Sequence, residues 1–134
     1  MNINIMVGKY RLMGDVQEDF SQAYPFLRLE FYKRHGLSNG TRIKQRLNRQ
    51  DLLSAAGVKK DGILKIGDAM TVGQLENIFR DQFGAMVQVS RNSGGIWLET
   101  TMTDNWTLKQ QNDHGRELSV PLKKDPADDE IDYD

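Results

Sequence analysis

Cysteine is absent from this chain, and histidine and proline are scarce. The 134 residues include two histidines and three prolines. Without cysteine there can be no disulfide, no thiol catalysis and no thiolate metal ligand, which fits a reducing compartment. The histidines, His35 and His114, each stand immediately before a glycine, at a predicted turn or helix end. We expect no metal site and no cofactor, because metal binding needs several suitable ligands that converge.

A long hydrophobic run is also missing. No stretch of about 18 apolar residues occurs, and the opening MNINIMVGKY alternates polar with apolar residues as a strand does. We therefore expect a cytoplasmic protein with no membrane segment. No nucleophile elbow accompanies the serines, and the glycines lack the spacing and lysine of a P-loop. The sequence predicts that the protein is not an enzyme.

The middle of the chain carries the most explicit local patterns. Thr71 and Gln74 have the spacing of a capping box, which predicts a helix start worth about 1 kcal/mol. Apolar residues follow at helical spacing until Gly84, and the segment Met86–Val89 is predicted to be a strand. Since Ile63–Ile66 is also a predicted strand, this part of the chain is expected to run β-α-β.

The same order of elements is predicted roughly sixty residues earlier. A strand over Ile3–Val7 precedes a helix that Pro25 ends, and another strand follows over Phe26–Tyr32. The aligned aromatic pairs are Phe20 with Phe79 and Tyr24 with Phe83. We predict an α+β fold of two pseudo-repeats, each β-α-β-β-α, over residues 1–61 and 62–120. Their antiparallel sheets are expected to have helices packed on one side.

Each predicted unit closes with a hairpin and a short helix. The predicted closing elements are a strand over Thr41–Leu47, a helix from Asn48 to Gly57, a turn at Asn92–Gly95, a strand over Ile96–Thr101, a helix over Asp104–Asn112 and a last strand over Glu117–Val120. A longer helix that starts at Thr41 is an alternative, because Ile43 and Leu47 also fit helical spacing.

Apolar residues on one side of these elements form the predicted core. They are Ile3, Ile5, Val7, Val16, Phe20, Leu27, Leu29, Phe31, Leu53, Leu64, Ile66, Val72, Leu75, Phe79, Phe83, Val87, Val89, Ile96 and Leu98. Residues 121–134 are predicted to be a disordered acidic tail, because their composition cannot bury enough surface to offset chain entropy.

Charge is distributed unevenly, although the net charge is only -1. Eight basic residues and the single acid Asp51 lie between Lys33 and Lys60, whereas Asp125–Asp134 holds six acids and no base. The candidate residues for binding nucleic acid or another polyanion are Lys33, Arg34, Arg42, Lys44, Arg46 and Arg49. The alternative is that these side chains protect an edge strand from aggregation. The tail could bind a basic partner, fold back onto the basic residues or only aid solubility.

Trp97 is the candidate residue for binding a protein partner. Strand alternation directs it away from its apolar neighbours, so we expect an outward-facing ring with Arg91 and Glu99 close by. Aromatic residues dominate interface hot spots. The alternative is that the closing helix covers Trp97 through Trp106.

The second predicted unit also carries a resemblance. The string TVGQLENIFRDQFG, followed by VQVSRNSGGIWLETTMTDNWTLKQQN, resembles a family of small uncharacterised bacterial proteins over residues 63–115. The resemblance implies no activity and no functional residues. We expect a non-enzymatic protein-interaction module, an adaptor or inhibitor, with nucleic-acid or polyanion binding as the alternative. An exposed sheet edge could also support a homo-oligomer.

Overall fold

The chain folds into helices and two antiparallel sheets, an α+β arrangement as predicted. The computed structural model describes residues 1–38 and 41–119, and within residues 34–44 it describes the backbone alone. The elements are β1 (Asn2–Val7), α1 (Met13–Ala23), β2 (Leu27–Ser38), β3 (Thr41–Arg46), the 3-10 helix η1 (Leu53–Ala56), β4 (Gly62–Gly67), α2 (Val72–Phe83), β5 (Met86–Ser93), β6 (Ile96–Glu99), the 3-10 helix η2 (Thr101–Thr103) and α3 (Leu108–Ser119). The predicted acidic tail lies outside the described residues.

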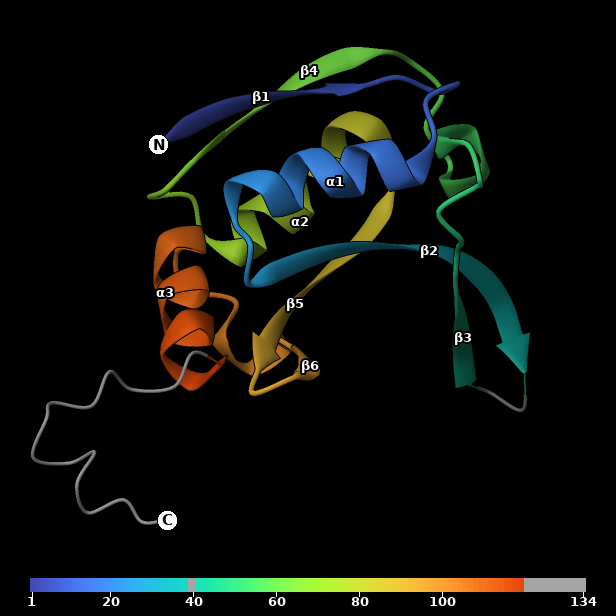
Figure 1. Ribbon diagram of the computed structural model, residues 1–134. Helices are drawn as coiled ribbons and strands as arrows, with labels where there is room; N and C mark the ends of the chain where they lie inside the picture. The colour runs from blue at the N-terminus through green and yellow to red at the C-terminus, as the bar shows by residue number, and fades with distance from the viewer. Residues whose placement is uncertain (39–40, 120–134) are drawn as a thin grey trace, which may run out of the picture.

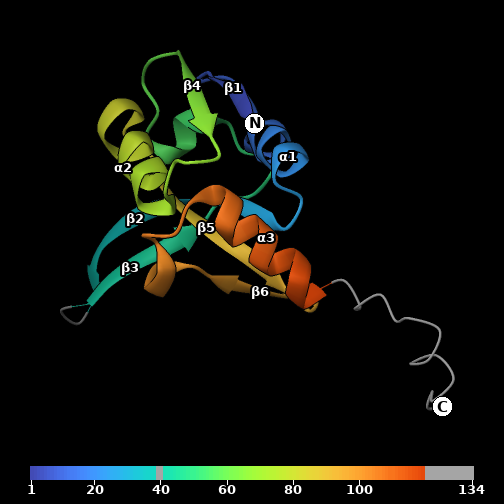
Figure 2. The same cartoon turned by 90° about the vertical axis from the view of Figure 1, so that its left-hand side faces the viewer.

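The strands form a two-stranded ribbon and a four-stranded sheet. In the ribbon β1 pairs with β4, and in the sheet the order is β3-β2-β5-β6, with every neighbouring pair antiparallel. Helices α1 and α2 lie below the ribbon and above the four-stranded sheet in Figure 1, and the same order holds after the turn to Figure 2. The two helices therefore bury their apolar sides between two layers of strands.

One hydrophobic core fills the space between these layers. The ring of Phe31 on β2 packs against the ring of Phe79 on α2. The ring centres are 5.6 Å apart, and the ring planes are nearly perpendicular. Most predicted core residues are buried, although Ile3 is only partly so. Ile96 and Leu98 were predicted wrongly, since they are 64% and 45% exposed. They belong to the edge strand β6, whereas α3 packs against β5.

The starts of α1 and α2 differ as their sequences predict. At the start of α2, Thr71 Oγ1 accepts a hydrogen bond from the Gln74 N–H (3.1 Å), and Gln74 Oε1 accepts one from the Thr71 N–H (2.9 Å). Leu12 occupies the same position before α1 and provides no side-chain cap. Gly84 ends α2 with a φ of 73°, a conformation that glycine adopts without strain.

Two closing elements differ from the prediction. The region after Asn48 forms only the 3-10 helix η1, while Thr41–Arg46 is a strand, so the longer helix is wrong. The last helix is α3, and the predicted strand at Glu117 is helical up to Ser119. A Cβ on Gly115 would stand 2.9 Å from the Phe26 Cβ and 3.0 Å from the Asn92 carbonyl oxygen. Glycine therefore allows α3 to approach the sheet closely here and does not end the helix.

Backbone hydrogen bonds recur in the two halves of the chain. In the first half they tie the segments around α1 and β2 to residues 47–54, and in the second half they tie the segments around α2 and β5 to residues 100–109. The equivalent bonds, donor first, are Met13 to Asp51 and Val72 to Trp106, Gly14 to Arg49 and Gly73 to Asp104, Leu53 to Arg11 and Leu108 to Met70, Ser54 to Lys9 and Lys109 to Asp68, and Leu47 to Phe31 and Thr100 to Val89.

Candidate interaction surface

One face of the four-stranded sheet points away from α1 and α2. Strand alternation gives this outer face every second residue of each strand, opposite the buried set that includes Leu29 and Phe31. The registers bring together on it Arg28, Glu30 and Tyr32 from β2, Arg46 from β3, Met86, Gln88 and Ser90 from β5, and Trp97 and Glu99 from β6. The candidate site lies on this face.

A buried carboxylate organises the outer face. The side chain of Glu30 is only 4% exposed, and its oxygens lie 2.7 Å from Arg28 Nη2 and 3.1 Å from Arg46 Nη2. The hydroxyl of Tyr32 donates a third contact to Glu30 at 3.1 Å. We call these four residues the Glu30 cluster. Burying a carboxylate is costly unless charged partners and hydrogen bonds compensate it, and here both are present.

The hydroxyl of Tyr32 stays protonated in this cluster. Burial raises the pKa of the Tyr32 phenol, and the negative charge of Glu30 raises it further, while a hydrogen bond with Arg46 opposes the rise. A phenol already titrates far above neutral pH, so an upward shift keeps the proton in place. Tyr32 is therefore a hydrogen-bond donor to Glu30 under ordinary conditions.

Trp97 lies next to the Glu30 cluster. The guanidinium carbon of Arg28 stands 4.5 Å from the centre of the Trp97 ring, within cation–π distance. Arg28 is thus held from two sides, by the indole and by the carboxylate of Glu30. The ring of Trp97 is itself only partly covered. The outer face therefore presents an aromatic ring whose position is fixed by neighbouring charges.

The structure separates the predicted neighbours of Trp97. Glu99 stands on the outer face with Trp97, but Arg91 pairs with Leu98 and so points to the opposite face. There the Nη1 of Arg91 donates to Gln111 Oε1 at 2.7 Å, and its guanidinium lies 5.9 Å from the ring of Trp106. Arg28, which sequence reasoning missed, contacts Trp97 in its place. Only the pairing of β2 with β5 and of β5 with β6 could have revealed it.

The structure describes the side chains of only some of the predicted basic residues. Arg46 belongs to the Glu30 cluster and is 60% exposed, and Arg49 is exposed nearby. Lys33 pairs with Gln45 and therefore points to the other face of the sheet. The register places Arg34 opposite Lys44, while the side chains of Arg34, Arg42 and Lys44 lie outside the described part of the chain.

Two grooves lie beside the sheet, at equivalent places in the two halves. The α1 groove, about 400 Å³, lies between α1 and β2, and it is lined by Gln17, Glu18, Ser21, Arg28, Glu30 and residues 46–49. The α2 groove, about 490 Å³, lies between α2 and β5, and its lining includes Tyr32, Glu76, Asn77, Arg80, Met86 and Val87. The lining of the α1 groove includes three arginines, whereas the lining of the α2 groove includes Arg80 together with the apolar residues Ala85, Met86 and Val87.

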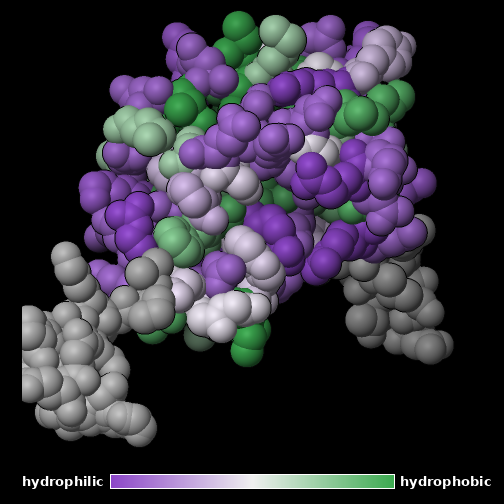
Figure 3. Space-filling view, in the orientation of Figure 1, coloured by the Kyte–Doolittle hydropathy of each residue, from purple (hydrophilic) through white to green (hydrophobic). Residues whose placement is uncertain are grey.

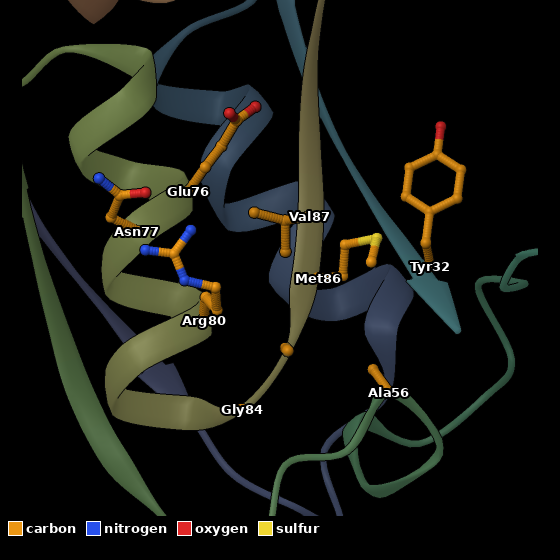
Figure 4. Close-up of a pocket in the computed structure, with 9 residues that line it drawn as sticks. Tyr32, Ala56, Glu76, Asn77, Arg80, Gly84, Met86 and Val87 are labelled. Carbon is orange, nitrogen blue, oxygen red and sulfur yellow. The ribbon is translucent and has the colours of Figure 1, made fainter. Parts of the chain in front are cut away.

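The α2 groove contains an open strand edge. Figure 4 shows Val87 pointing towards α2 and Met86 pointing to the other side of β5, where Tyr32 lies. Val89 accepts a hydrogen bond from Thr100 on the side away from β2, at 3.2 Å. Val87, two residues earlier, directs its backbone groups to the same side, while β6 pairs only with residues 90–93. The groove therefore exposes a short edge of β5.

The face of the molecule seen in Figure 3 is mostly hydrophilic. Figure 3 shows hydrophobic residues mainly along the upper part of one face, over the ribbon. Met6 and Ile63, which pair across the ribbon, are 62% and 60% exposed. No helix in the described ranges is long and apolar enough to cross a membrane. Nor do three His, Asp or Glu side chains of the described residues gather where they could hold a metal ion.

Comparison with known proteins adds no further information about the site. No protein-family model, curated protein or solved structure matches the chain.

Proposed function

We propose that this chain is a non-enzymatic protein-interaction module that binds its partner through the outer face of the four-stranded sheet. The observation that carries the proposal is the Trp97 ring stacked on Arg28, which is itself paired with the buried Glu30. Tryptophan, tyrosine and arginine are the residues most enriched at interface hot spots, and positions fixed before binding reduce the entropy cost of association.

The proposed module is a duplicated unit. Equivalent backbone hydrogen bonds, the pairing of β1 with β4 and of β2 with β5, and the two grooves at matching positions support a division into residues 1–61 and 62–120. In a duplicated unit one half can preserve the structure while residues of the other half change. The two grooves, which have different lining residues at matching positions, are consistent with such a change. Trp97 stands on the second unit and Arg28 on the first, so the proposed binding face needs both.

Substitution of Trp97 tests the proposed function. Proteins retained from a lysate of the source cells by the full chain are compared with those retained by Trp97→Ala, with Tyr10→Ala as the matched control. Tyr10 is an aromatic residue that is 75% exposed and belongs to the loop between β1 and α1. At least one protein is expected to bind the chain and the control but to bind Trp97→Ala about tenfold more weakly. Identical sets from all three chains would contradict the proposal.

Nucleic-acid binding is the second candidate. The exposed Arg46 and Arg49, together with the backbone register that sets Arg34 opposite Lys44, favour it. Phosphate binding must weaken steeply with salt, because it releases counterions, while an interface anchored by Trp97 depends much less on salt. Labelled single- and double-stranded nucleic acids, titrated at low and moderate salt, separate the two candidates. Absence of binding at low salt would remove the second.

A further inference from the structure

The α1 groove lies along a stretch of the β2 edge that no strand of the described residues covers. Strand β3 pairs with β2 from Tyr32 onward, and before that point side chains of α1 reach the edge. Gln17 Nε2 donates to the Leu29 carbonyl at 2.7 Å, and Ser21 Oγ donates to the Leu27 carbonyl at 3.0 Å. These two bonds hold α1 and β2 together and fix one wall of the groove.

Two buried polar atoms in this groove have no hydrogen-bond partner among the described residues. They are Gln17 Oε1 and Arg28 Nε, and within the described side chains they are the two buried atoms left in this state. Both residues line the α1 groove. Leaving a buried polar atom unpaired is costly, so a ligand that pairs with these atoms gains affinity. Gln17 Oε1 can accept a hydrogen bond, and Arg28 Nε can donate one.

This combination matches a peptide group. The N–H of a peptide group can donate to Gln17 Oε1, and its carbonyl can accept from Arg28 Nε. An ionised phosphate has acceptors alone and would leave Gln17 Oε1 unpaired. The two atoms therefore favour a protein segment over a nucleic-acid backbone.

The charges around the groove favour an acidic segment. Arg28, Arg46 and Arg49 line it together with the carboxylates of Glu18 and Glu30. Glu30 is buried between two of the arginines, whereas Arg46 remains 60% exposed. Within the described residues Arg49 donates one long hydrogen bond, 3.4 Å, to the Gly14 carbonyl. Each guanidinium has five N–H donors, so Arg46 and Arg49 keep donors for a bound carboxylate.

We infer that the α1 groove binds an extended acidic segment of a partner protein, with a peptide group on Gln17 and Arg28 and carboxylates on Arg46 and Arg49. The inference rests on the proposed protein-interaction function and names the chemistry of the partner. The equivalent groove offers a contrast, because Glu76, Asn77 and Met86 stand there where the α1 groove has Gln17, Glu18 and Arg28.

A labelled hexaglutamate peptide is the probe, and hexaglutamine of equal length is its control. Fluorescence anisotropy with the full chain at low salt is expected to show binding of hexaglutamate and about tenfold weaker binding of hexaglutamine. The double variant Arg46→Gln with Arg49→Gln is expected to lose about tenfold in affinity for hexaglutamate. The matched double variant Lys59→Gln with Lys60→Gln removes the same charge from an exposed loop and is expected to bind like the unmodified chain.

Two further measurements distinguish a loss of binding from a disruption of the structure. Arg49→Gln alone leaves the Glu30 cluster intact, so a loss of binding in this variant cannot come from disruption of that cluster. In a nitrogen-15 spectrum of the full chain, added hexaglutamate is expected to shift the Gln17 side-chain amide and the Arg28 Nε–H signals. Unchanged affinity in both arginine variants, or no shift at these two signals, would overturn the inference.

Other occupants give different results. A hexauridine oligonucleotide that displaces hexaglutamate and binds more tightly would assign the groove to nucleic acid. Binding of hexaglutamate only to a chain that ends at Lys124 would show that the acidic residues 125–134 of this chain occupy the groove. Either result overturns the inference. If hexaglutamate fails to bind while capture still depends on Trp97, only this inference fails. If it binds while capture does not depend on Trp97, only the proposed outer-face function fails.

Discussion

At the scale of single residues, the outer face depends on Glu30, because Arg28, Arg46 and the Tyr32 hydroxyl converge on its buried carboxylate. The pattern of β2 correctly places Arg28, Glu30 and Tyr32 on the polar face. The burial of Glu30 could not be predicted from this pattern. The side chains that cover Glu30 come partly from β3, and their position depends on the register between β2 and β3. The place of Trp97 on a strand predicts its outward direction, but its contact with Arg28 likewise requires the order of β2, β5 and β6. Cross-strand neighbours are therefore the information that one sequence does not contain.

We predict that Glu30→Gln destabilises the protein by about 1 to 3 kcal/mol. The amide keeps the shape and can still accept from Tyr32, but the carboxylate that both Arg28 and Arg46 contact is lost. The estimate lies below the usual value for a broken buried ion pair, because these arginines are 35% and 60% exposed and remain partly hydrated. Urea unfolding measures the change.

The control for this prediction is Glu18→Gln. Glu18 is exposed on α1, so its substitution should change the free energy of unfolding by less than about 0.5 kcal/mol. Equal unfolding midpoints for Glu30→Gln and the unmodified chain would show that the Glu30 cluster contributes nothing to stability.

At the scale of elements, local chemistry predicts helix starts better than helix ends. The capping box at Thr71 and Gln74 is correct, and the same spacing recurs at Thr107 and Gln110, where reciprocal hydrogen bonds of 2.8 and 3.1 Å open α3. That second box is visible in the sequence and would have placed the start of α3 correctly. The end of α3 was missed because Gly115 lies inside the helix. Whether a glycine stops a helix or allows close packing depends on the tertiary neighbour, which is the sheet in this case.

The caps of α1 and α2 allow a paired test. Thr71→Ala removes the hydrogen bond that Thr71 Oγ1 accepts from the Gln74 N–H, while the backbone N–H of residue 71 can still donate to Gln74 Oε1, and the substitution is expected to cost about 1 kcal/mol. Leu12→Thr introduces a capping side chain three residues before Asp15 and is expected to stabilise the chain by up to about 1 kcal/mol. Thermal unfolding of the two variants and of the double variant measures both effects. Destabilisation by Leu12→Thr would mean that the 41% exposed Leu12 contributes more by packing than a cap would.

At the scale of the whole molecule, the order of elements and most of the core follow from the sequence. Helical spacing and alternation identify the buried apolar positions of β1, β2, β4 and β5 because each of these strands buries a row of alternate apolar residues. The arrangement of the layers does not follow from the sequence. It depends on β1 pairing with β4 and β2 with β5, partners that lie about sixty residues apart along the chain. Two units side by side with separate sheets would have produced the same local patterns.

This pairing predicts that neither proposed unit folds alone. A chain of residues 1–61 would lose the partner strands of both β1 and β2, and it would be small enough for its core to be marginal. We expect residues 1–61 and 62–134, prepared separately, to lack a cooperative thermal transition, and an equimolar mixture to recover the circular dichroism spectrum of the full chain. Val89→Lys in the second fragment should prevent recovery, since Val89 is fully buried on β5 and a charged side chain is costly to bury in the core. A cooperative transition in residues 1–61 alone would contradict the shared core and would identify that unit as an independent domain.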